Sequence, residues 1–124
     1  MESQLKNAFR LARSHGDIEV IFEPFAKAVL YAVAREIGGG APPAYFAQPA
    51  PAGKGHCITV AEGRERLAAI PDVVLLQTTG RKLLEELEPA LGILVVYDQG
   101  GDYLSREQLD WFRANLLPTL PKAR

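Results

Sequence analysis

The chain has a single cysteine, Cys57, among its 124 residues. One cysteine cannot form an internal disulfide, so the sequence does not encode a disulfide-stabilised secreted domain and fits a reducing compartment. The chain has only two histidines, and so few nitrogen and sulfur ligands make a zinc site improbable. We therefore predict a cytoplasmic protein with no metal site and no bound cofactor.

Neither sign of charge dominates, and long apolar runs are missing. The 14 basic and 15 acidic residues are interspersed and give a formal net charge of −1. Without a basic block, nucleic acid and anionic membranes are poor candidates as partners. The longest apolar stretch, Val29 to Ala34, is too short to cross a bilayer, and the first 16 residues lack the apolar segment of a signal peptide. We expect neither nucleic acid nor membrane as a partner.

Catalytic signatures are missing as well. The patterns G-x-S-x-G and H-E-x-x-H and the phosphate-binding P-loop do not occur. His56 and Cys57 are neighbours in a predicted strand, so their side chains point to opposite faces and cannot act together as nucleophile and base. Cys57 is better explained as a small buried apolar residue. The sequence therefore predicts a protein that is not an enzyme and has no catalytic residues.

The clearest structural signal lies between Asp72 and Asp98. Two continuous apolar runs, Val73–Leu76 and Ile93–Val96, are typical of strands covered on both faces. Leucines recur at helical spacing between them, and a helix of this length usually joins two parallel strands. We predict a single α/β domain over residues 1–124, with a mixed sheet of about five strands, a central parallel β-α-β unit and helices packed on the sheet.

Local patterns predict the other elements. The N-terminal segment 1–16 is expected to be a helix, whose apolar stripe packs on the sheet or, alternatively, docks in a groove on another protein. Pro24 is expected in the first turn of a short helix, because proline is poorly tolerated deeper in one. The further expectations are helices at 24–28 and 62–70, strands at 29–34, 45–47 and 56–61, and an antiparallel hairpin around the proline-rich loop 48–55.

The last helix has the most specific start signal. Ser105 and Gln108 form an S-x-x-Q capping box, in which each side chain satisfies a backbone N–H of the first turn. Pro118 and Pro121 then end the helix, and residues 118–124 are predicted to be a frayed tail.

The order of these patterns resembles one known family. The relevant motifs are E-R-L at residues 65–67, L-L-x-x-L at 83–87, a glycine followed by an apolar strand at 92–96, and L-S-x-E-x-L at 104–109. Together they resemble the SseB N-terminal domain family, named for enhanced serine sensitivity. The resemblance covers the chain from about residue 29 onward and implies a small bacterial α/β domain with a binding or regulatory role. The chain departs from the family in having no proline in the turn after residue 96.

Two loops at strand ends are candidates for a site that binds a small anion or metabolite, with the first loop as the anion site. Thr78, Thr79, Gly80 and Arg81 follow one strand and combine hydroxyls, a backbone amide and a guanidinium at a helix N-terminus. The ordinary explanation is that a threonine simply caps the helix. The second loop contains Asp98 and Asp102, which would lie opposite the first if both strands end at the same sheet edge. These two aspartates are better explained as a solvated turn.

Two aromatic residues are candidates for a protein interface. Trp111 falls off the apolar face of the last helix, and together with Tyr103 it would form an aromatic patch if both are exposed. Burial in the core is the alternative. We predict a non-enzymatic bacterial binding or regulatory module that acts through protein–protein contacts, with a protein partner or self-association as a homodimer. The alternative is a domain that binds a small anion or metabolite at the Thr78–Arg81 helix N-terminus.

Overall fold

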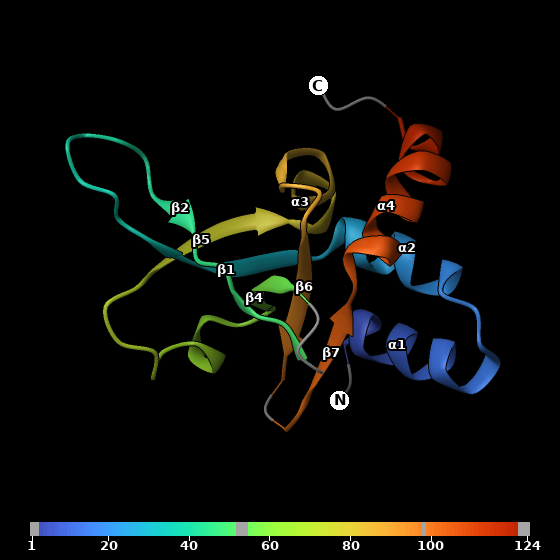
Figure 1. Cartoon of the computed structure of the whole chain (residues 1–124). Coiled ribbons are helices and arrows are strands. Elements are labelled where there is room, and N and C mark those ends of the chain that lie inside the picture. Colours follow the sequence, from blue (N-terminus) through green and yellow to red (C-terminus); the bar gives the residue numbers. More distant parts are fainter. Residues whose placement is uncertain (1–2, 52–54, 98, 122–124) are drawn as a thin grey trace.

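The computed structural model describes residues 3–51, 55–97 and 99–121. Its layout is one mixed sheet with helices on one of its faces (Figure 1). The helices are α1 (Gln4–His15), α2 (Glu19–Lys27), α3 (Gly80–Glu86) and α4 (Arg106–Asn115), with short 3₁₀ turns at Arg64–Arg66 and Leu117–Thr119. The strands are β1 (Val29–Arg35), β2 (Ala44–Tyr45), β3 (Gln48–Pro49), β4 (His56–Ala61), β5 (Val74–Thr79), β6 (Leu91–Val96) and β7 (Gly101–Leu104). The predicted fold class is confirmed.

The parallel pair of the sheet is β4 with β6, and the prediction placed it elsewhere. The segment β5-α3-β6 does form strand, helix and strand, but β5 pairs antiparallel with β1, and β1 pairs antiparallel with β4. The main strand order is therefore β5-β1-β4-β6-β7, so β5 and β6 run in the same direction with β1 and β4 between them. Sequence order could not reveal this, because strand pairing depends on which distant segments bury their faces together.

The proline-rich hairpin forms, but its first strand lies later in the sequence than predicted. Gln48 pairs with Cys57 and Pro49 with His56, three residues beyond the expected start of the strand. The segment from β2 to β3 passes from the end of β1 to the beginning of β4 and fills the space where these two strands diverge. Residues 52–54 of the loop lie outside the described residues.

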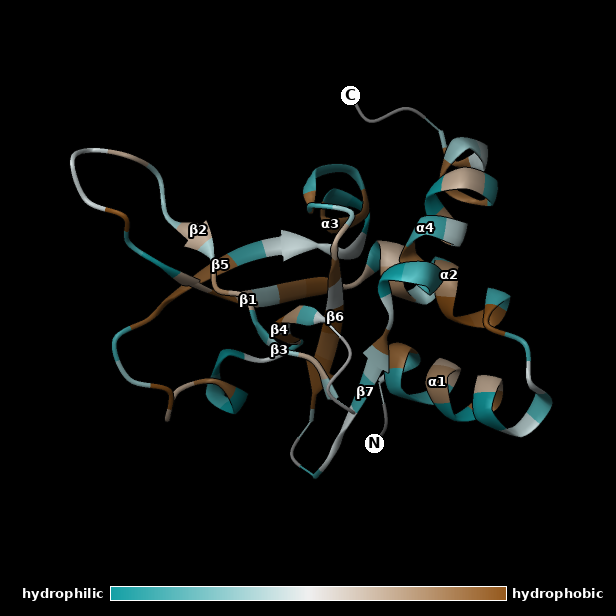
Figure 2. Ribbon diagram, in the orientation of Figure 1, coloured by the Kyte–Doolittle hydropathy of each residue, from teal (hydrophilic) through white to brown (hydrophobic). Residues whose placement is uncertain are grey.

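The main core lies between the sheet and the helices. Phe25 of α2 and Phe112 of α4 are fully buried, and the rings of Phe22 and Phe112 meet edge to face at 5.5 Å. Leu5 and Phe9 bring the apolar stripe of α1 into the same cluster, which confirms that this stripe packs within the domain. Figure 2 shows the corresponding division of the helices into one hydrophobic and one hydrophilic side. No helix among the described residues is long and apolar enough to cross a membrane.

Two predicted helices differ from the observed ones. Helix α2 begins at Glu19, five residues before Pro24, and Asp17 accepts a hydrogen bond from the Glu19 N–H at 2.9 Å. Pro24 lies inside this helix, where its missing N–H removes one backbone hydrogen bond, the one to the Val20 carbonyl near the start of the helix. The predicted helix at 62–70 is only a 3₁₀ turn at Arg64–Arg66. Leu67, which follows the turn, is buried, whereas Ala68 and Ile70 are exposed.

The face of the sheet opposite the helices has a smaller cluster. Val33, Ala61 and Leu67 are buried there, with Phe46 and Leu75 packed against them. The segment between β4 and β5 therefore covers this face with a loop rather than with a helix.

The C-terminal part contains the predicted capping box and one unpredicted strand. Ser105 accepts a hydrogen bond from the Gln108 N–H, and Gln108 returns one from the Ser105 N–H at 2.9 Å. Strand β7 was interpreted from the sequence as a turn, because its four residues are too few to show alternation. Leu117–Thr119 adds a 3₁₀ turn and Leu120 packs against the core, whereas residues 122–124 of the expected tail lie outside the described residues.

Candidate functional site

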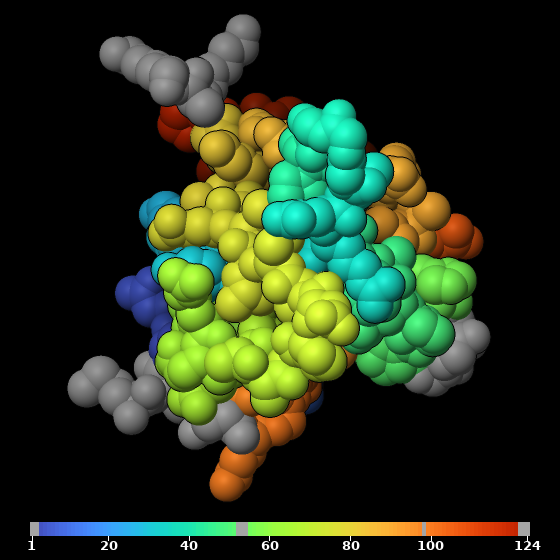
Figure 3. All heavy atoms as spheres, turned by 90° about the vertical axis from the view of Figure 1, so that its left-hand side faces the viewer, coloured from blue at the N-terminus to red at the C-terminus, as the bar shows by residue number. Residues whose placement is uncertain are grey.

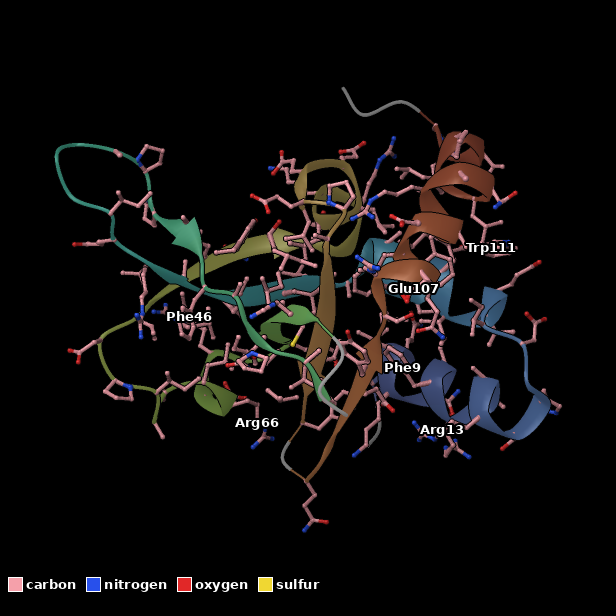
Figure 4. The ribbon with its side chains drawn as sticks, viewed as in Figure 1. Phe9, Arg13, Phe46, Arg66, Glu107 and Trp111 are labelled. Atoms are coloured by element: carbon pink, nitrogen blue, oxygen red, sulfur yellow. The ribbon has the colours of Figure 1, made fainter. Side chains whose placement is uncertain are left out.

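A groove lies between α1 and the outer edge of the sheet. It has a volume of about 360 Å³. Its apolar lining comes from both N-terminal helices and from β7, and its polar rim comes from three further side chains. The apolar residues are Phe9, Ala12, Ile18, Ile21 and Leu104, and the polar ones are Arg13, Asp102 and Gln108. Figure 4 places Phe9 between α1 and β7, with Arg13 one turn further along the helix.

One wall of the groove is the unpaired edge of β7. The Tyr97 N–H donates to the Gly100 carbonyl at 3.0 Å and closes the β6–β7 hairpin. This hydrogen bond shows which residues of β7 bond to β6 and which do not. In an antiparallel pair, residues that exchange hydrogen bonds alternate with residues whose backbone groups point away. By the observed register, Asp102 and Leu104 bond to β6, and the N–H and C=O of Tyr103 point outward.

Gly101 lies two residues before Tyr103, so its backbone groups point outward as well. In the part of the chain that the structure describes, β6 is the only strand that pairs with β7. Gly101 and Tyr103 therefore present a short row of donors and acceptors along this edge, and Tyr103 lies in the lining of the groove. A row of this kind is where an extended chain can add itself to a sheet.

The rim carries a connected polar cluster. Arg13 and Asp102 form an ion pair between α1 and β7, with side chains 61% and 11% exposed. The Lys6 ammonium lies 5.2 Å from the centre of the Tyr97 ring, a cation–π contact from the same helix. Lys6, Arg10 and Arg13 are spaced at i, i+4 and i+7, so they form one basic stripe beside Phe9. No acidic residue occurs within α1 itself, and the partner of Arg13 comes from β7.

The Tyr97 hydroxyl is buried at the base of this cluster. Burial is the main cause that raises the pKa of Tyr97 well above its usual value, and the Asp102 carboxylate beside it adds to the rise. Among the described residues, the hydroxyl has no hydrogen-bond partner of ordinary geometry. The cluster thus keeps Tyr97 neutral and uses Asp102 to hold α1 to the sheet through Arg13.

Comparison with protein-family models, curated proteins and solved structures found no match for this chain. Its function therefore has to be inferred from geometry. The resemblance to the SseB N-terminal domain family stays a prediction, since none of these comparisons bears on it.

A second cavity, of about 460 Å³, lies at the start of α4. His56, Tyr103, Ser105, Arg106 and Glu107 contribute to its lining. Most of its polar groups are already engaged nearby. Ser105 caps the helix, and Arg106 pairs with Glu107 at 3.4 Å. We regard this cavity as the weaker candidate because Ser105, Arg106 and Glu107 already have partners on α4.

The predicted anion-binding residues already make contacts within the sheet and within α3. Thr78 is 7% exposed and pairs with Leu30 in the sheet. The Thr79 hydroxyl accepts a hydrogen bond from the Lys82 N–H at 3.2 Å, the ordinary capping role. Arg81 pairs with Glu85 at 3.3 Å along α3, a helix of seven residues.

Gly80 has a packing role. A Cβ at this position would lie 1.9 Å from the Phe25 carbonyl oxygen, so glycine permits the close approach of α3 to α2. The Gly80 N–H also donates to the Ala28 carbonyl at 3.2 Å, which extends the β1–β5 ladder by one residue pair.

The structure does not bring Thr78–Arg81 and Asp102 together. Figure 1 shows α3 far from the turn between β6 and β7, because β5 and β6 are separated by two strands in a twisted sheet. Asp102 belongs to the α1–β7 groove, and Asp98 lies outside the described residues.

Tyr103 and Trp111 lie on different sides of the sheet. The Tyr103 side chain crosses Gly92 on the face away from the helices, where a Cβ on Gly92 would be 2.5 Å from the Tyr103 hydroxyl. Trp111 is 37% exposed on the outer side of α4 (Figure 4), with its ring 6.1 Å from that of Phe112. The two residues therefore do not make one aromatic patch.

Sequence reasoning missed the groove residues of α1 and α2. The apolar stripe of α1 was visible, but nothing in the pattern showed that Phe9 and Ala12 would border a strand edge. Cys57 is fully buried, as predicted. No cluster of three or more His, Cys, Asp or Glu side chains with the spacing of a metal site occurs within the described ranges.

Proposed function

We propose that this protein is a non-enzymatic binding module that takes an extended segment of a partner protein into the α1–β7 groove. The observation that carries this proposal is the outward-pointing backbone of the β7 edge, where Tyr103 lies beside the apolar lining of the groove and Gly101 continues the edge. A peptide in extended conformation would pair with this edge and add one strand to the sheet. Main-chain hydrogen bonds then supply affinity, and alternate side chains of the peptide supply specificity.

The lining favours a particular kind of segment. Side chains at alternate positions of an added strand point to the same side, so one set would face Phe9, Ile18 and Ile21. This set is expected to be apolar. Arg13 lies in the lining of the groove, and Lys6 and Arg10 continue the basic stripe along α1, so we expect acidic side chains at the peptide positions nearest to this helix. The proposed partner segment is therefore extended, acidic and apolar at every second residue.

Selection from a displayed library of random heptapeptides tests this proposal. A selected peptide is synthesised, and its effect on backbone amide exchange is followed by NMR. Strand addition predicts that the amides of Gly101 and Tyr103 become protected on binding. Those of Asp102 and Leu104, which already bond to β6, should be protected with and without peptide. Binding that leaves the Tyr103 amide unprotected would contradict the proposal.

A groove-filling variant provides the matched control. Ala12 is small and borders the groove, so Ala12→Leu should occupy the space and weaken peptide binding by about tenfold or more, the effect expected from losing one or two buried contacts. Leu11→Ala alters the neighbouring exposed residue outside the groove and should bind normally. Equal binding by both variants would place the peptide elsewhere.

A further inference from the structure

The other edge of the sheet, strand β5, has unusual features for an exposed edge. Residues 73–80 contain no charged side chain, and Val74, Leu75 and Leu76 are all partly exposed. Proteins usually protect a free edge strand with a charge, a proline or a bulge. In Figure 3 this segment, in yellow, lies on the surface with no other segment over it.

The hydrogen-bond ladder shows which backbone groups of β5 are free. The Gly80 N–H donates to the Ala28 carbonyl, so these two residues form a hydrogen-bonded pair of the β1–β5 ladder. Hydrogen-bonded pairs recur at every second residue of an antiparallel ladder, so Leu76, four residues before Gly80, also bonds to β1. Leu75 and Gln77 alternate with Leu76, so their N–H and C=O groups point away from β1. Throughout the described ranges, β1 is the only strand that pairs with β5.

From these features we propose that β5 pairs antiparallel with β5 of a second copy of this chain, across a two-fold axis at Leu76. This register matches Leu75 of each copy with Gln77 of the other, so every outward donor meets an outward acceptor. The two Leu76 side chains face each other on the helix side, and the partly exposed apolar side chains of both copies continue the core across the axis. A two-fold interface of this kind is self-complementary by construction.

The charges at the ends of β5 favour a second copy of this chain as the partner. Asp72 precedes the uncharged run, and Arg81 and Lys82 follow it. Antiparallel pairing with an identical strand brings the acidic end of each copy to the basic end of the other. Parallel pairing would instead place like charges together. This inference does not rest on the proposed function, because β7 and its groove lie at the opposite edge of the sheet.

Analytical ultracentrifugation over a concentration series tests the dimer. The wild-type chain should sediment with twice its monomer mass of 13.5 kDa. Gln77→Pro removes an outward N–H without touching the ladder to β1, and the symmetric loss of two hydrogen bonds should weaken association by about tenfold or more. Gln77→Thr keeps the N–H and should remain dimeric. Circular dichroism and thermal melting establish that both variants are folded.

If Gln77→Pro does not fold, Gln77→Lys provides the same test, since it places a charge at an exposed edge position without changing the backbone. A wild-type monomer at millimolar concentration would overturn the proposal. So would a dimer that survives Gln77→Pro or Gln77→Lys, or one that Trp111→Ala dissociates, since this last result would place the interface on α4.

Cysteine cross-linking tests the register. In a Cys57→Ala background, Leu76→Cys should oxidise to a covalent dimer, because facing residues in a non-hydrogen-bonded antiparallel pair have Cα atoms about 4.5 Å apart, within the range of a disulfide. Gln77→Cys would face Leu75 of the other copy and should cross-link far more slowly. Faster cross-linking of Gln77→Cys would overturn the pairing at Leu76.

Discussion

Arg13 of α1 and Asp102 of β7 form an ion pair between residues that are 89 positions apart in the sequence. The Asp102 carboxylate is largely buried next to the Tyr97 hydroxyl, while the Arg13 guanidinium is largely exposed. This pair lies at the polar rim of the groove that we propose as the peptide site. It therefore connects the N-terminal helix to the edge of the sheet and sets the distance between the two groove walls.

The strength of this ion pair can be measured with a double-mutant cycle. Arg13→Ala leaves the Asp102 carboxylate partly buried without its cation, so we expect a coupling energy with Asp102→Ala of about 1 kcal/mol, at the upper end for exposed pairs. Urea denaturation gives the four free energies of unfolding. The same cycle on Lys27 and Glu23, a pair with side chains 71% and 68% exposed, should give a clearly smaller coupling energy, because water screens both charges. Equal coupling energies in the two cycles would contradict the idea that burial of the Asp102 carboxylate strengthens its ion pair.

Tyr97 should make the protein sensitive to alkaline pH. Its pKa is raised in the folded state above the usual value of about 10, so the folded chain holds the phenol proton more tightly than the unfolded chain. Stability from this group is then fully present below about pH 10 and is lost as the pH rises above it. Tyr97→Phe should show a shallower loss of unfolding free energy in this range. Burial also raises the pKa of Cys57 and Tyr103, so part of the slope should remain.

At neutral pH, Tyr97→Phe should unfold with the same free energy as the wild type or up to about 1 kcal/mol more. The reason is that the variant removes a buried hydroxyl that lacks a hydrogen bond of ordinary geometry. Denaturant titrations at pH 7 and at several values above pH 9 provide both comparisons. A loss of more than 1 kcal/mol at pH 7 would mean that the hydroxyl makes a stabilising hydrogen bond to Asp102.

Gly80 should be intolerant of any side chain. A Cβ there would lie 1.9 Å from the Phe25 carbonyl oxygen, and backbone atoms can yield only if α2 and α3 move apart. We expect Gly80→Ala to lower the free energy of unfolding by about 3 kcal/mol, as measured by denaturant titration. Gly63→Ala is the matched control. The atoms that its Cβ would meet belong to the flexible Glu65 side chain, so it should cost less than about 1 kcal/mol. Similar losses for the two variants would contradict this explanation.

Much of the local structure was predictable from short-range chemistry. The capping box of Ser105 and Gln108, the apolar stripe of α1 and the apolar runs of β5 and β6 specify their elements, because each depends on residues within a few positions. The prediction of α2 was wrong at its start, because the helix continues through Pro24 and loses only one backbone hydrogen bond there. Thr79 was recognisable as either a cap or a ligand, and both interpretations use the same short-range features.

The sequence by itself thus determined the fold class, most helices and strands, and the burial of Cys57. Only the tertiary structure decided that β1 and β4 lie between β5 and β6, that β5 and β7 are the two free edges, and that Asp102 meets Arg13. These relationships depend on contacts between segments far apart in the chain. The apolar pattern and the local caps specify which faces of the elements are buried. Several other elements could cover each of these faces, however, and the pairing that forms is the one in which the whole core packs closely.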